Sequence, residues 1–301
     1  MHSKIILIGA LALLVACGGA DAPEAATKEH LVIGGDDASD HAGNYYQMPT
    51  PNELFQLVRT MSSDGQKQMM SPARNVDRYA TTAKKALNFG VYATDLVYAS
   101  NYKITSEVVR YYLTCKKLGE QLGLAGSFTD KDFSRLERNL TRGDSLDVIS
   151  NDAYERAYRR MQDHDMGPTL ALVLAGGWVE SMHLVTRQVL HVDPQDPLVQ
   201  RVAEQKVSLD HLMELMAQYS GSPQVDSVRN ELSKLRDIYD TFPVVRGEHP
   251  EKSPSGRQIL GDDITIVITT DGFNQLTKRV EALRESIILP EDIISSAPNL
   301  N

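Results

Sequence analysis

Two otherwise apolar stretches of the sequence carry the polar and aromatic side chains that are candidates for a functional site. They are Asn88, Tyr92 and Asp95 in the first stretch, and Trp178, Glu180 and His183 in the second. The four- and three-residue spacings in the first stretch place its three side chains on one face of a helix. Such groups could line a polar pocket for a ligand, or they could satisfy one another in an internal hydrogen-bond network. The network is favoured, because a site requires convergent groups with perturbed pKa values and the sequence demonstrates none.

Glu180 and His183 also have the Glu-x-x-His spacing of di-iron carboxylate bundles, in which both side chains face inward from one helix. Such a centre needs a second Glu-x-x-His and two further Glu, and neither His191 nor the pair His211 and Glu214 fits that pattern. Because several ligands must converge on a metal ion, the sequence predicts no metal site and no cofactor. His183 is interpreted as a hydrogen-bonded histidine.

The sequence contains no Gly-x-Ser-x-Gly, no His-Glu-x-x-His and no phosphate-binding loop. The acidic run at 34–40 lacks the spacing and the terminal Glu of a calcium loop. Cys115 lies beside Lys116 and Lys117, which can lower a thiol pKa, but no His or Asn partner is near it in the sequence. A structural thiol is therefore predicted there, and enzymatic activity stays open, leaning towards none.

Two helices must position the candidate side chains, one at about 83–101 and the other at about 170–189. Each carries glycine near its middle, at Gly90 in the first and at Gly176 and Gly177 in the second. A glycine inside a helix costs about 1 kcal/mol relative to alanine, and it is usually kept where something packs close to the backbone. We therefore expect the two helices to cross closely at the centre of the fold, with large aromatic side chains beside the crossing.

The rest of the chain predicts a mainly α fold of antiparallel helical hairpins, in a bundle or an irregular solenoid. Helix starts, stops and apolar periodicity give the further helices. They are expected at about 51–62, 76–101 (which contains the first central stretch), 105–123, 129–140, 145–163, 198–219, 224–240 and 272–288. A short β-hairpin is expected at about 257–269, from strands at 257–260 and 264–269 around a tight turn. One helical domain at 46–290 and a loose tail at 291–301 are predicted.

The N-terminus has the pattern of a processed, lipid-anchored protein. Residues 1–16 contain one basic residue and a short apolar run, which indicates a secretory signal peptide. Leu14-Val-Ala-Cys17 resembles the bacterial lipoprotein box, in which the Cys is lipidated and begins the mature chain. Residues 17–45 are predicted to be a flexible tether. Gly18 after the Cys is similar to the outer-membrane sorting pattern, so we expect a lipid anchor in the outer membrane with the body facing the periplasm.

The charge of the chain restricts its partners. Removal of residues 1–16 takes away Lys4 and changes the net charge from −9 to −10. An acidic protein is a poor nucleic-acid binder, because phosphate contacts need clustered Lys and Arg. The sequence therefore predicts contact with a membrane through Cys17, a possible protein partner in the cell envelope, and no nucleic acid.

Most of the chain from about Met48 onward resembles a group of uncharacterised lipoproteins from Bacteroidota. The likeness rests on Pro49 and Pro51 and on three segments, which are Ala86–Tyr98, Leu174–Glu180 and Gln258–Ile287. The resemblance implies a helical lipoprotein and carries no activity with it. Two hypotheses follow for the function, namely a lipid-anchored binding or scaffold module, or a small-ligand binder or enzyme with a polar pocket near Asp95 and His183. The first is favoured by the anchor, the tether and the lack of a catalytic motif.

Overall fold

The computed structural model describes residues 66–140, 146–246 and 264–291. In these ranges the chain is mainly helical and its helices pack as a bundle, so the predicted fold class is confirmed. The predicted signal peptide, Cys17, the tether, the helix at 51–62 and residues 292–301 lie outside the described residues.

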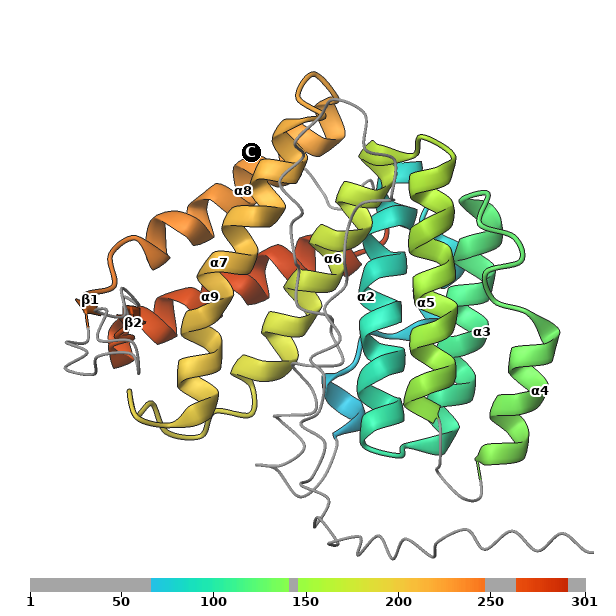
Figure 1. The fold of residues 1–301 in the computed structure, drawn as a ribbon, viewed down its shortest axis with the longest axis horizontal. Coiled ribbons are helices and arrows are strands. Elements are labelled where there is room, and N and C mark those ends of the chain that lie inside the picture. The colour runs from blue at the N-terminus through green and yellow to red at the C-terminus, as the bar shows by residue number, and fades with distance from the viewer. Residues whose placement is uncertain (1–65, 141–145, 247–263, 292–301) are drawn as a thin grey trace, which may run out of the picture.

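The α-helices follow the predicted order closely, and Figure 1 shows how they are arranged. They are α2 (Thr82–Asn101), α3 (Thr105–Gln121), α4 (Asp130–Asn139), α5 (Leu146–Asp163), α6 (Gly167–Thr186), α7 (Pro197–Ala217), α8 (Pro223–Tyr239) and α9 (Thr270–Ile288). Capping side chains and proline residues determine where several of these helices begin. The Thr129 side chain accepts the Asp132 N–H in a capping box that opens α4, and Pro197 begins α7 directly after its N-cap Asp196.

The prediction that the first central helix starts at about residue 76 is wrong. Two 3₁₀ turns, Lys67–Met69 and Ala73–Arg78, precede α2. The α-helix begins only at Thr82, because the Thr81 side chain caps it by accepting the Lys84 N–H. We call residues 66–79 the strap, since this segment crosses the helices without joining α2.

The close crossing predicted from the glycines is present between α2 and α6. A Cβ atom added at Gly90 would lie 2.0 Å from the Val173 carbonyl oxygen, and one added at Gly176 would lie 2.0 Å from that of Leu87. Only glycine allows the backbones to approach this closely. By length and composition α6 could cross a membrane, but 94% of its most apolar window is buried inside the fold, as befits a central core helix.

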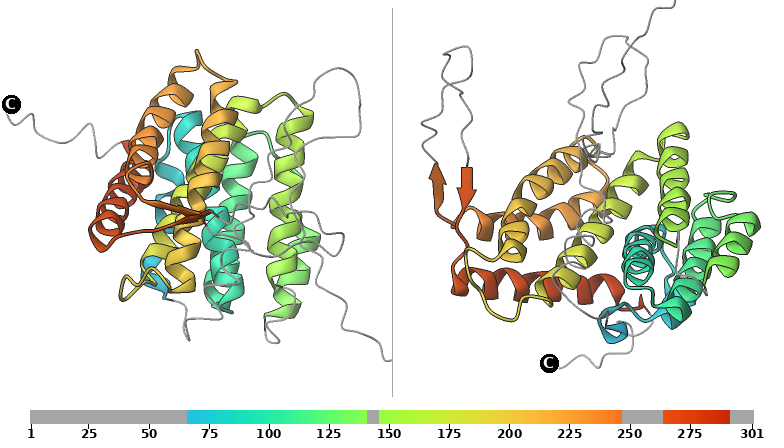
Figure 2. Two further views of the ribbon diagram at one scale, coloured as in Figure 1. Left: turned by 60° about the vertical axis from the view of Figure 1, so that its left-hand side comes forward. Right: turned by 60° about the horizontal axis from the view of Figure 1, so that its bottom comes forward.

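Helix α6 lies between two groups of helices. It contacts α2 and α5 on one side and α7, α8 and α9 on the other, and Figures 1 and 2 show the two groups flanking it. Within the groups, α3 packs on α2, α4 on α5, and α7 and α9 on α8. The polar candidates of α2 and α6 are therefore placed at the centre of the molecule, within reach of α3 and α9.

The predicted hairpin differs in its pairing. The strand expected at 264–269 is present as β2 (Ile264–Ile266), and it pairs antiparallel with β1 (Val244–Arg246), a stretch in which no strand was predicted. β-branched Val244 and Val245 favour extended backbone. The Pro and Gly residues near them masked this strand signal in the sequence. Strand β2 is short because the Thr269 side chain caps α9. Residues 257–260, the predicted partner strand, lie outside the described residues.

Candidate functional site

The strap is held by side chains that bind its main chain. The Ser71 N–H donates to Asp95 Oδ2 at 3.0 Å, and Tyr111 Oη donates to the Ser71 carbonyl at 2.5 Å. Tyr92 Oη donates to the Pro72 carbonyl at 2.9 Å. Burial raises the pKa of Tyr92 and of Tyr111, so both hydroxyls keep the protons that they donate. Helices α2 and α3 thus fix the strap at two successive residues.

Helices α6 and α9 bind the same segment two residues earlier, at the carbonyl of Met69. His183 Nε2 lies 3.0 Å from this oxygen, and Arg284 Nη2 donates to it at 3.2 Å. The other ring nitrogen of His183, Nδ1, lies 2.9 Å from Glu281 Oε1, which also accepts from Arg187 Nε at 2.8 Å. The main chain of the strap is therefore bound from four helices, which makes it a fixed part of the fold.

A buried ion pair lies beneath these contacts. Arg284 Nε donates to Glu180 Oε2 at 2.6 Å and Arg284 Nη2 to Glu180 Oε1 at 2.8 Å, a bidentate arrangement. The Glu180 side chain has no exposed area. A carboxylate so deeply buried is tolerated because a cation and further hydrogen bonds replace its water.

Asp95 is a second fully buried carboxyl beside this pair. Burial, and then the negative charge of Glu180, raise the pKa of Asp95 well above its ordinary value. Its Oδ1 has no hydrogen-bond donor facing it among the described residues, while a side-chain contact joins Asp95 to Glu180. Two carboxyl oxygens can share such a contact only when one carries a proton. This contact and the raised pKa of Asp95 favour its protonated form, whose Oδ2 accepts from the Ser71 N–H.

The raised pKa of Asp95 makes the free energy of unfolding depend on pH. A group whose pKa is raised in the folded state contributes stability that is complete below its unfolded pKa and is lost as the pH rises towards the folded pKa. We expect the free energy of unfolding of the wild type to fall as the pH rises from about 4 to neutrality. This fall should be steeper than in Asp95→Asn, and the slopes of the two proteins should differ by up to about 1.4 kcal/mol per pH unit. Urea unfolding of both proteins across this range measures the difference, and parallel curves would contradict a protonated Asp95.

Asn88 lies on the same face of α2 but binds a different segment. Its Nδ2 donates to the Lys84 carbonyl and to the Ile287 carbonyl, each at 2.9 Å. Lys84 Nζ also donates to the Ile287 and Leu289 carbonyls, which places a cation at the negative end of α9. In return, Glu291 accepts the N–H groups of residues 80 and 81 at the start of α2. Glu291, predicted to begin a loose tail, is thus anchored.

Trp178 does not join the cluster. It lies two residues before Glu180, a rotation of about 200° around the helix axis, so the two side chains leave α6 on nearly opposite sides. Trp178 is buried, and its Nε1 has no hydrogen-bond partner in the described part of the chain. Of the six candidate residues, Tyr92, Asp95, Glu180 and His183 meet at the strap, Asn88 binds the end of α9, and Trp178 packs elsewhere.

Arg284 and Tyr111 were not among the predicted site residues, although both are essential to the arrangement. Arg284 follows Leu276 and Val280 at four-residue intervals, which places a cation on the apolar face of α9. That irregularity was a usable signal for a buried partner. Tyr111 gave no such signal, because an aromatic residue on an inner helix face is ordinary core.

The polar cluster bonds mainly to the chain itself. Asp95, Glu180 and Tyr92 have no exposed area, and their partners are the strap and α9. In the three described ranges, no group of three or more His, Cys, Asp or Glu could hold a metal ion. Cys115 is buried as well, and its burial raises the pKa of the thiol. No protein-family model, no curated protein and no solved structure matches this chain.

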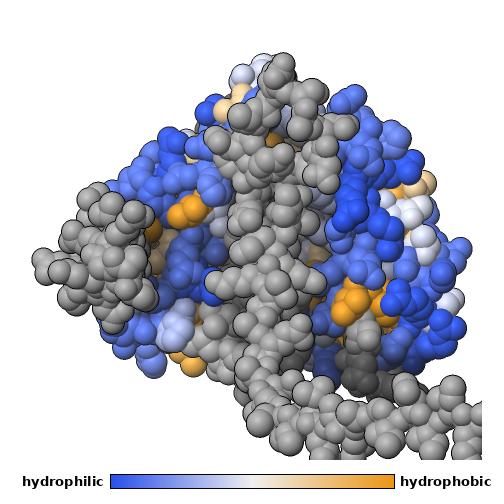
Figure 3. All heavy atoms as spheres, in the orientation of Figure 1, coloured by the Kyte–Doolittle hydropathy of each residue, from blue (hydrophilic) through white to orange (hydrophobic). Residues whose placement is uncertain are grey.

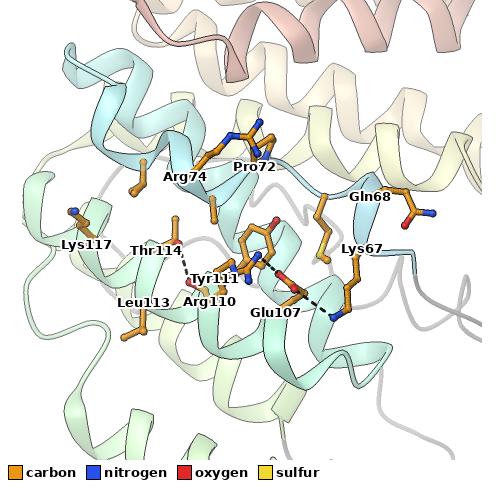
Figure 4. A pocket seen from close by; sticks show the side chains of 13 residues that line it. Lys67, Gln68, Pro72, Arg74, Glu107, Arg110, Tyr111, Leu113, Thr114 and Lys117 are labelled. Carbon is orange, nitrogen blue, oxygen red and sulfur yellow. Dashed lines mark hydrogen bonds and ion pairs between the residues drawn. The ribbon is translucent and has the colours of Figure 1, made fainter.

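An open groove lies on the outer side of the strap, between it and α3, with a volume of about 970 Å³. Figure 4 shows Gln68, Pro72 and Arg74 of the strap on one side and Arg110 and Leu113 of α3 on the other. Its other lining residues are Lys67, Met70, Ala73, Val76, Glu107, Tyr111, Thr114 and Lys117. The buried cluster thus holds one wall of a surface groove in place.

Proposed function

We propose that this protein is a lipid-anchored helical binding module of the bacterial cell envelope, attached through Cys17 to the outer membrane, with its body facing the periplasm. The observation that carries the proposal is the groove whose strap wall is fixed from four helices. A groove with a rigid wall binds without first losing conformational freedom. The anchor and the resemblance to lipoproteins support the location.

A small-ligand binder or an enzyme centred on Asp95 and His183 is the weaker candidate. Such a site needs polar groups that a ligand can reach. Here the strap main chain occupies the positions at which a ligand would bond to Asp95, Tyr92 and His183. The polar groups consequently act on the fold, and the outer surface carries the binding role. Figure 3 shows that the visible described surface is mostly hydrophilic, with small separate apolar patches.

Site-specific photo-crosslinking in the cells that produce the protein tests the binding role. A photoreactive amino acid is placed at Leu113, in the groove, or at Val148 on α5, whose exposed fractions of 47% and 49% make them matched sites. We expect discrete crosslinked products from position 113 and none from position 148. Metabolic labelling with palmitate should mark the wild type in the membrane fraction, and Cys17→Ser should lose both the label and the membrane attachment.

Each half of the proposal can fail separately. Equal crosslinking at the two positions, or none at position 113, would remove the groove as a binding surface. Palmitate label that persists in Cys17→Ser would remove the lipid anchor at that residue.

A further inference from the structure

The groove carries a charge opposite to that of the protein. Its lining contains four cations, which are Lys67, Arg74, Arg110 and Lys117, and the carboxylate Glu107, so it has a net charge of +3. The whole chain has a net charge of −9. Because exposed charges are screened beyond about 8–10 Å at physiological salt, a ligand inside the groove responds to the local cations more than to the distant carboxylates.

The cations are only partly neutralised by the protein. Lys67 and Arg110 share the single carboxylate of Glu107, at 3.6 and 3.2 Å. Lys117 pairs with Asp77, beside the groove. Arg74 is exposed, and no ion pair of Arg74 occurs among the described residues. About two positive charges are left for a partner, one at Arg74 on the strap and one shared by Lys67 of the strap and Arg110 of α3.

The shape of the groove fits an extended chain. One wall is the face of α3 formed by Arg110, Leu113 and Lys117, at positions i, i+3 and i+7, which spans about 10 Å. An extended peptide rises about 3.3 Å per residue, so four or five residues would cover the wall. Buried Met70 and Tyr111 form an apolar floor, and Leu113 is half exposed between the two cations of the wall.

From these observations we propose that the groove binds a short extended acidic peptide segment of another envelope protein, with an apolar side chain against Leu113 and carboxylates at Arg74 and Arg110. The proposal rests on the proposed function of a binding module and names its partner class. A long polyanion or an anionic membrane fits less well, because either would extend beyond the groove along a protein whose net charge is −9. A short peptide confines its charges to the four cations.

The buried cluster gives this groove its geometry. Arg74 follows Ser71 and Pro72, whose main-chain groups are bonded to Asp95, Tyr111 and Tyr92. The position of the Arg74 wall relative to α3 is consequently set before a peptide arrives, which lowers the entropy cost of binding.

Fluorescence anisotropy with the full chain in mild detergent tests the partner class. The probe is fluorescein-labelled Gly-Asp-Glu-Leu-Asp-Glu-Gly, and its matched control is the amide peptide Gly-Asn-Gln-Leu-Asn-Gln-Gly. We expect the acidic peptide to bind at least about tenfold more tightly than the amide peptide, with a difference that shrinks as salt rises. Arg74→Glu, alone and combined with Arg110→Glu, should remove the difference, whereas Lys278→Glu on an exposed turn of α9 should change affinity less than about twofold.

Arg74→Glu alone is the variant less liable to misfold, because Arg74 is exposed and has no ion pair with any residue that the structure describes. Equal affinity for the two peptides, or acidic-peptide binding that survives Arg74→Glu, would overturn the proposal. Binding of phosphatidylglycerol vesicles that depends on Arg74, without peptide binding, would overturn it in favour of a lipid surface. If position 113 still crosslinks in cells while the acidic peptide fails, the partner class is wrong and the binding module stands. If position 113 does not crosslink, the proposed function itself fails.

Discussion

Gly176→Ala is expected to lower the free energy of unfolding by about 3 kcal/mol. The added Cβ would lie 2.0 Å from the Leu87 carbonyl oxygen and 2.8 Å from its carbonyl carbon. These are backbone atoms, so no rotamer change can relieve the overlap, and α2 and α6 must move apart at their crossing. The gain in helix propensity from Gly to Ala is about 1 kcal/mol, which offsets only part of this loss.

A Gly-to-Ala substitution away from the α2–α6 crossing provides the control. A Cβ at Gly119 in α3 would meet the Phe89 ring at 3.4 Å, an ordinary contact, so Gly119→Ala should leave stability unchanged or raise it by up to about 1 kcal/mol. Urea unfolding followed by far-ultraviolet circular dichroism measures both variants. Equal stabilities for the two would show that the crossing is looser than these distances imply.

The crossing could be predicted from the sequence because glycine inside an apolar helix has few physical explanations. Gly90, Gly176 and Gly177 are costly to helix stability, and close backbone approach is the usual compensation. The start of α2 could not be predicted as well. Ser71 and Pro72 have the composition of a helix start, but their main-chain groups are bonded to Asp95, Tyr111 and Tyr92 and so leave the helical path.

The sequence predicted which polar side chains of the candidate site share a helix face, but it did not predict their partners from distant segments. The spacing of Tyr92 and Asp95 on α2, and of Glu180 and His183 on α6, identified polar groups on inner helix faces. Their partners come from distant parts of the chain, since Ser71 is 24 residues from Asp95 and Arg284 is 104 residues from Glu180. Helical periodicity gives the face that a side chain occupies, and it does not specify which segment covers that face.

Arg284→Met should lower the free energy of unfolding by about 3–5 kcal/mol at neutral pH. The substitution keeps an unbranched side chain in the space of the guanidinium, so lost packing contributes little. It leaves the Glu180 carboxylate without its cation, with no exposed area and with Asp95 beside it. Urea unfolding at neutral pH measures the loss.

A surface ion pair on the same network is the matched control for this prediction. Arg187 also pairs with a carboxylate, that of Glu281, but its side chain is 56% exposed. Arg187→Met should therefore cost less than about 1 kcal/mol. Losses of similar size for Arg187→Met and Arg284→Met would mean that burial of the Glu180 pair does not control its contribution to stability.

The decisive variant combines Arg284→Met with Glu180→Gln, because a buried charge costs most when its partner alone is removed. The amide at position 180 keeps an oxygen that can accept from a protonated Asp95, and His183 still lies 3.0 Å from the Met69 carbonyl oxygen. The double variant should therefore regain at least about 2 kcal/mol relative to Arg284→Met alone, a coupling typical of residues in direct contact. If the double variant is instead less stable than Arg284→Met, Arg284 stabilises the fold mainly through the strap carbonyl, and the ion pair is secondary. Recovery would show that the unpaired Glu180 carboxylate causes most of the loss in Arg284→Met, and that neither charge is needed for most of the stability of the fold.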